Sequence, residues 1–223
     1  MEAVRKGAIH KGKPWPDGIV EEMQQLGVPE WWIESCRKIQ YLFPKAHAVA
    51  YVMMAFRIAW FKVHEPLAYY SAYFYRRSQK DGFDAESMLR GIDVCREKIR
   101  AIEKNPAPTA KEEDLLTTLE AVYEFYLRGF RFLSIDIYKS DAYQFQIEDG
   151  ALRPPFVAIS GLGGAAAEDL ANCRKNGREF VSVDDISDAC PKVQRSHIDQ
   201  LKNLGALRDL PESRQTSLFD GLL

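Results

Sequence analysis

One long apolar helix is predicted between two prolines, in the segment FPKAHAVAYVMMAFRIAWFKVHEP at positions 43–66. Pro44 suits the first helical position, because its ring presets φ and its missing N–H would have no partner there. Pro66 disfavours the helical conformation of the residue before it and therefore marks the end. The roughly 20 residues between the two prolines would form about 30 Å of helix.

The side chains of this segment favour a buried core helix over a membrane span. At 100° per residue, apolar side chains lie on nearly every side of the helix. Arg57 and Lys62 interrupt the apolar run, and no uncharged stretch approaches the ~18 residues expected of a span. We therefore expect a core helix with a few polar groups directed at an unidentified partner group, and no membrane partner.

Two basic side chains near the start of this helix indicate an anion site. Lys45 and His47 fall in the first turn, where free backbone N–H groups and the helix dipole disfavour cations. A bound phosphate would remove this conflict. The alternative is that Lys45 is an ordinary surface residue and His47 a core residue with satisfied hydrogen bonds.

Several segments resemble one protein family. MEAVRKG, VPEWWIESCRKIQYLFPKAHAVAY and RIAWFKVHEPLAYYSAYF are similar to the fingers region of bacterial C-family replicative DNA polymerases, nearest to the PolC type of the DNA polymerase III alpha chain. The resemblance covers essentially the whole chain, and its first residues resemble an interior segment of the family. It implies the C-terminal portion of a longer polymerase, whose fingers contact the incoming deoxynucleoside triphosphate through Lys45, His47 and, more weakly, Arg57.

Composition sets few limits on function. The 223 residues are 46% hydrophobic and 28% charged with a formal net charge of -2, which is ordinary for a globular protein. Basic residues concentrate between Arg37 and Arg77, where the only acidic residue is Glu65, so a polyanionic partner is permitted. The four cysteines show no CxxC spacing, which indicates neither a zinc site nor a disulfide framework. A reducing, cytoplasmic location is therefore expected.

The remaining chain is predicted to be mostly helical. The patterns indicate helices at 20–26, from 29 onward, at 84–104 and at 113–127, and two or three short strands with a turn within 131–152. The aromatic run 67–78 ends in Arg76 and Arg77 and has two interpretations. It would either stack on bases and hold phosphates, or form a core helix with arginines at its favourable C-terminal end.

A helix-hairpin-helix pattern is predicted in FVAISGLGGAAAEDLANCRKNG, residues 156–177. Gly161, Gly163 and Gly164 would let the backbone turn and approach a phosphate, Leu162 would anchor the loop, and the start of the second helix would donate N–H groups. Arg174 and Lys175 would add positive charge. The alternative is a glycine-rich turn with no ligand. Residues 182–205 resemble a degenerate second half of a tandem unit, with a mainly structural role.

The C-terminal tail contains a short peptide, QTSLF, that resembles the sliding-clamp-binding peptide of bacterial polymerases. By this resemblance Gln215 would hydrogen-bond to the clamp, while Leu218 and Phe219 would fill apolar pockets. Thr216 replaces the apolar residue usual in the family, which would weaken the contact.

The sequence thus predicts a mainly α fold with a small β-hairpin: polymerase fingers at 1–150, a tandem helix-hairpin-helix domain binding duplex DNA at 151–208, and a flexible clamp-binding tail at 209–223. No carboxylate cluster suited to two Mg²⁺ ions is evident, so no catalytic residue is assigned. The chain alone should not polymerise DNA, and Mg²⁺ is expected only in the missing palm. Expected partners are primer-template duplex, deoxynucleoside triphosphates, the sliding clamp and the remainder of the polymerase. The alternative is a non-catalytic DNA-binding adaptor that engages the clamp.

Overall fold

The computed structural model describes residues 2–79, 82–174 and 177–213. Its regular structure is almost entirely helical, with one antiparallel pair of strands among the described residues, which confirms the predicted fold class. The chain divides into two units, Met1–Ala59 and Trp60–Leu223. This division concerns packing alone, and the functional boundaries near residues 150 and 208 stay predictions.

The first unit contains short helices joined by glycine turns: α1 (Glu2–Arg5), α2 (Ile19–Gln25) and α3 (Glu30–Lys38). As predicted, α2 ends at a left-handed glycine, Gly27, with φ 72°. The small interior of this unit includes Ile33 and Cys36 of α3. Gly7 lies directly against the backbone of Gln40, since a Cβ at Gly7 would be 1.9 Å from the Gln40 carbonyl oxygen.

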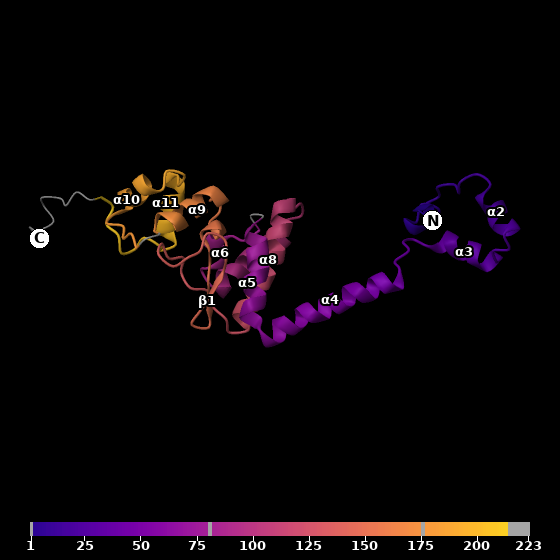
Figure 1. Cartoon of the computed structure of the whole chain (residues 1–223), viewed down its shortest axis with the longest axis horizontal. Helices are drawn as coiled ribbons and strands as arrows, with labels where there is room; N and C mark the ends of the chain where they lie inside the picture. Colours follow the sequence, from indigo (N-terminus) through magenta and orange to yellow (C-terminus); the bar gives the residue numbers. More distant parts are fainter. Residues whose placement is uncertain (1, 80–81, 175–176, 214–223) are drawn as a thin grey trace, which may run out of the picture. The chain divides into compact units, whose positions relative to one another are not determined.

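The long apolar helix forms as predicted, but its predicted burial is wrong. Helix α4 (Lys45–His64) is continuous (Figure 1) and ends just before Pro66. None of its residues is buried, and Phe56 and Val63 are 73% and 66% exposed. A helix that is apolar on all sides needs neighbours on all sides, and the described residues supply no such cover. Within them, α4 is long and apolar enough to cross a membrane by length and composition alone.

Four helices follow and form one layer of the second unit: α5 (Pro66–Ser78), α6 (Ala85–Met88), α7 (Ile92–Glu103) and α8 (Ala110–Leu127). The single helix predicted at 84–104 is wrong, because the chain breaks after α6 and resumes after Gly91, whose φ of 107° is incompatible with a helix. Asp84 does not cap α6. Its carboxylate instead accepts hydrogen bonds from Ser87 at 2.6 Å and Lys98 at 2.8 Å.

Helix α8 ends where the sequence predicts, but it begins at Ala110, three residues before the predicted start, because residues 109–112 form its cap. The Thr109 side chain accepts from the Glu112 N–H at 3.2 Å, and the Glu112 carboxylate accepts from the Thr109 N–H at 2.8 Å, which forms a capping box. The helix ends before Gly129, which has φ 81°. The end of this helix therefore lies where the sequence predicts it.

The aromatic run forms α5, and its position favours the core interpretation over base stacking. Tyr70 and Phe74 are fully buried and therefore inaccessible to a base. Arg77 bonds to Thr118 at 2.6 Å and pairs with Asp114 of α8 at 2.8 Å. These contacts fix α5 against α8.

The last turn of α4 is attached to α5 and α8 by a polar cluster. Lys62 donates to one carboxylate oxygen of Glu124 at 2.7 Å, and the Tyr70 hydroxyl donates to the other at 2.9 Å. Arg128 donates to the Lys62 carbonyl at 3.0 Å. Partial burial alone would raise the pKa of Glu124, but the hydrogen bonds from Lys62 and Tyr70 outweigh it and hold that pKa below its usual value. Glu124 thus stays ionised and holds the end of α4.

The prediction of short strands within residues 131–152 is correct only for the C-terminal half of that segment. Strands β1 (Gln146–Glu148) and β2 (Ala151–Arg153) pair antiparallel around a turn in which Asp149 and Gly150 have φ 51° and 73°. Two positive φ values are typical of the two-residue hairpin turn. The part of the predicted 131–152 segment that includes residues 135–138 is instead a loop, because the Asp136 side chain accepts the N–H groups of Tyr138 and Lys139.

The C-terminal part of the second unit is a group of short helices: η1 (Phe156–Ala158), α9 (Gly164–Cys173), α10 (Val183–Ala189) and α11 (Arg195–Asn203). Helices α9, α10 and α11 lie together (Figure 1). Their buried side chains belong to the same hydrophobic core as α5 and α8, a core that runs from Tyr70 to Leu207. The helix predicted before the glycine hairpin is a single turn of 3₁₀ helix.

Candidate nucleic-acid interface

The glycine hairpin between η1 and α9 has the predicted geometry. Leu162 is 2% exposed and anchors the loop in the core, as expected. Gly161 has φ 78°, a left-handed conformation that a side chain would strain. The Leu162 N–H donates to the Ile159 carbonyl at 3.1 Å. The loop therefore turns sharply and places α9 directly after it.

The start of α9 presents unpaired backbone donors. Gly163 is the N-cap residue and offers no side-chain acceptor. The N–H groups of Gly163, Gly164 and Ala165 have no hydrogen-bond acceptor among the described residues. By contrast α10 is capped by Ser182, whose hydroxyl accepts from the Asp185 N–H at 3.2 Å. An open helix start of this kind suits an anion, because donors and dipole act together.

Gly164 is required for close packing. A Cβ at this position would lie 2.6 Å from the Tyr143 hydroxyl oxygen. That hydroxyl donates to Glu168 one turn along α9 at 2.7 Å. Gly164 therefore lets the Tyr143 side chain cover one side of the helix start.

The structure places Arg174 in a supporting position. Its guanidinium donates to the carbonyls of Ile137, at 3.1 Å, and Ser140, and lies 5.6 Å over the Phe156 ring. Burial lowers the pKa of Arg174 from its usual value. These contacts tie α9 to the preceding loop, so the predicted DNA contact of Arg174 finds no support in its position. Lys175 lies outside the described residues.

The second hairpin unit, residues 183–203 with α10 and α11, contacts the first directly. His197 of α11 is 8% exposed, and its Nε2–H donates to the Gly161 carbonyl at 3.1 Å. The Lys192 N–H, in the loop between α10 and α11, donates to Asp169 of α9 at 3.0 Å. Sequence reasoning missed both contacts, because neither residue stands in a recognisable spacing with its partner.

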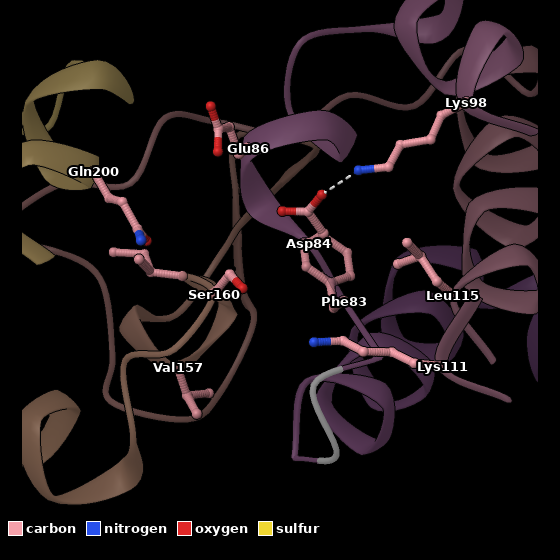
Figure 2. Close-up of a pocket in the computed structure, with 10 residues that line it drawn as sticks. Phe83, Asp84, Glu86, Lys98, Lys111, Leu115, Val157, Ser160 and Gln200 are labelled. Carbon is pink, nitrogen blue, oxygen red and sulfur yellow. Dashed lines mark hydrogen bonds and ion pairs between the residues drawn. The ribbon is translucent and has the colours of Figure 1, made fainter. Parts of the chain in front are cut away.

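A cleft of about 340 Å³ lies beside the hairpin, between the α6–α8 helices and the η1 segment. Figure 2 shows Lys98 reaching Asp84 on one wall, with Ser160 and Gln200 on the other. Burial alone would raise the pKa of Asp84, but hydrogen bonds from Lys98 and Ser87 hold it below its usual value. The ionisable side chains that line the cleft are Asp84, Glu86, Lys98 and Lys111, and of these Lys98 and Asp84 form an ion pair.

The predicted nucleotide-binding residues do not converge. Lys45, His47 and Arg57 are all exposed on α4. Lys45 and His47 point about 160° apart around the helix, and Arg57 lies about 18 Å further along from Lys45. His47 instead lies between the rings of Phe43 and Tyr51, with centroid distances of 4.8 and 4.6 Å. Their contact with nucleotide stays a prediction.

The other predicted sites can be placed only in part. Within residues 2–79, 82–174 and 177–213, no group of three His, Cys, Asp or Glu side chains could hold a metal ion. The residues predicted to bind the clamp, Gln215, Leu218 and Phe219, lie outside the described residues.

Comparisons with known proteins agree with this geometry. A helix-hairpin-helix motif family matches residues 129–217, which include the glycine hairpin, α9, α10 and α11. DNA polymerase III PolC-type from Thermotoga maritima is 47% identical over 211 residues, covering 95% of this chain and 15% of that protein. The PolC-type polymerases of Caldanaerobacter subterraneus and Clostridium perfringens are 47% and 46% identical, covering 95% and 98% of the chain.

The chain spans about 15% of the length of these curated relatives. The aligned segments cover 95–98% of this chain and therefore include both units. Over nearly its whole length, the chain is therefore homologous to one segment of PolC-type DNA polymerase III, and this segment carries a helix-hairpin-helix motif.

Proposed function

We propose that this chain is the C-terminal portion of a PolC-type replicative DNA polymerase and that it holds the primer-template duplex by its phosphate backbone. The observation that carries the proposal is the open start of α9, where Gly163, Gly164 and Ala165 present N–H donors without a side-chain cap. The helix-hairpin-helix match over this region supports the assignment. Such donors fit a phosphate oxygen, and contacts to phosphates position a duplex without reading its bases.

The second part of the proposal is contact with the remainder of the polymerase. Helix α4 exposes large apolar side chains on every side, among them Phe56, Trp60 and Val63. A patch of this kind marks a surface that is covered in the working protein. We assign it to the rest of the polymerase chain, because the relatives extend far beyond the matched segment. Because the relatives extend so far, we also favour part of a polymerase over a stand-alone adaptor protein as the identity of this chain.

Three finer roles follow from the family and belong to the same proposal. Lys45 and His47 would contact the phosphates of the incoming deoxynucleoside triphosphate once α4 is covered, with Arg57 a weaker candidate. Gln215, Leu218 and Phe219 would bind the sliding clamp. Catalysis and its Mg²⁺ ions would reside in the rest of the polymerase, and the whole would act in the cytoplasm.

We expect this chain to bind a labelled duplex with an affinity that falls steeply as salt rises. Each phosphate contact releases counterions, so the slope of log affinity against log salt should be about -0.9 per contact. Fluorescence anisotropy at several salt concentrations measures it, and duplexes of unrelated sequence serve as the control. Strong preference for one sequence, or no binding at low salt by a folded chain, would contradict the proposal.

A further inference from the structure

We propose that His197 is a positioning residue for DNA binding: from the second hairpin unit it fixes the Gly161–Leu162 peptide, and so keeps the donors at the start of α9 directed outward. This inference rests on the proposed phosphate site at α9. It assigns a role to the second hairpin unit, which the sequence alone suggests is mainly structural.

The hydrogen bonds of His197 define its protonation state. The Gly161 carbonyl can only accept, so Nε2 carries the proton in the 3.1 Å contact. The Gln194 N–H can only donate, so Nδ1 is bare in the contact at 3.2 Å. His197 is therefore a neutral imidazole with both nitrogens satisfied, and its ring orientation is fixed by two backbone groups from different segments.

The peptide held by His197 is the turning point of the hairpin. Its carbonyl accepts from His197, and its N–H, that of Leu162, donates to the Ile159 carbonyl at 3.1 Å. Glycine reaches many backbone conformations at little cost, so a peptide that follows Gly161 at φ 78° needs outside contacts to stay in one orientation. Leu162 supplies one such contact through its buried side chain, and His197 supplies the other.

The second hairpin unit offers fewer free backbone donors to a phosphate than the first. The Asp169 carboxylate of α9 accepts the Lys192 N–H at 3.0 Å, so a negative group already occupies one donor of that loop. At the N-cap of α11, the Gln194 N–H is also occupied, because it donates to His197 Nδ1 at 3.2 Å. The two hairpin units thus differ at the N-cap: the Gly163 N–H of the first has no acceptor among the described residues, whereas the Gln194 N–H of the second is held by His197.

The test compares variants of the full chain by duplex anisotropy. In His197→Leu the side chain keeps a similar volume but cannot donate to Gly161, and we expect affinity to fall roughly fivefold or more. In His197→Gln the amide can replace the Nε2–H donor, so affinity should stay within about twofold of the original. Ser182→Ala is the matched control, since it removes the cap of α10 in the same unit without touching the hairpin.

Denaturant unfolding gives the folded fraction of each variant, and affinities are compared per folded molecule. A loss in His197→Leu that exceeds the loss in Ser182→Ala, with recovery in His197→Gln, is the expected result. Equal affinity of His197→Leu and Ser182→Ala would overturn the positioning role while leaving the phosphate site intact. Failure of the unsubstituted chain to bind any duplex would instead overturn the phosphate site, and this inference with it.

Discussion

Gly163→Asp should weaken duplex binding by roughly ten- to hundredfold while leaving the fold as stable as before, or more so. Gly163 is the N-cap of α9, with φ -64° and ψ 162°, a conformation open to any residue. A Cβ there would meet no atom within 4 Å. The substitution therefore introduces neither strain nor a clash.

The opposite signs of the two effects follow from one interaction. An Asp side chain at the N-cap accepts the free N–H groups of the first turn, which stabilises the helix by a few tenths of a kcal/mol or more relative to glycine. Those N–H groups are then no longer available to bind a DNA phosphate. Charge-assisted hydrogen bonds contribute about 1.5–3 kcal/mol, and the added carboxylate also repels the phosphate backbone of the DNA.

Two further variants separate the effect of the added negative charge from the effect of occupying the N–H donors of α9. Gly163→Asn provides a neutral cap of the same shape and should weaken binding less than Gly163→Asp. Gly163→Ala adds no acceptor and should bind nearly as well as the original chain. Anisotropy and denaturant unfolding provide both readouts. If Gly163→Asp bound duplex as tightly as Gly163→Ala, the start of α9 would not be the phosphate site.

Phe74→Ala should destabilise the chain by about 3–5 kcal/mol, whereas Phe56→Ala should change its free energy of unfolding by less than about 0.5 kcal/mol. Phe74 is fully buried, and its ring lies 5.5–5.8 Å from the rings of six other aromatic residues: Tyr70, Tyr73, Phe83, Phe125, Phe132 and Phe145. Its truncation leaves a cavity where the helical layer meets the hairpin strands.

Phe56 is the matched control, because the same truncation on α4 removes a ring that is 73% exposed. Total stabilities of domains are about 5–15 kcal/mol, so the loss at Phe74 is a large part of the whole. Denaturant unfolding at low protein concentration measures both variants. A large loss in Phe56→Ala would show that α4 is covered within this chain, against its observed exposure.

Local signals in the sequence predicted much of the fold. Pro44 and Pro66 bound α4 because proline acts through its own ring and the adjacent residue. Asp149 and Gly150 form the expected tight turn for the same local reason. The glycine hairpin could be predicted from the sequence in the same way, since Gly161 and the buried Leu162 have roles set by their immediate neighbours.

Features that depend on distant partners were missed or wrong. Apolar periodicity shows that α4 needs cover, but it cannot show whether this chain supplies it. The break near Gly91 was hidden, because Met88 and Cys95 continue one apolar stripe across it. The contact of His197 with Gly161 joins residues 36 apart in sequence, and only tertiary packing brings them together.

The most direct test of the account follows backbone amide resonances by NMR as the chain is titrated with a short duplex. The account predicts that the amides of Gly163, Gly164 and Ala165 shift strongly at low salt, and that the shifts shrink as salt rises. The capped start of α10, at Asp185, should shift little. Binding with large shifts elsewhere and none at Gly163–Ala165 would contradict the claim that this chain holds DNA by the open end of α9.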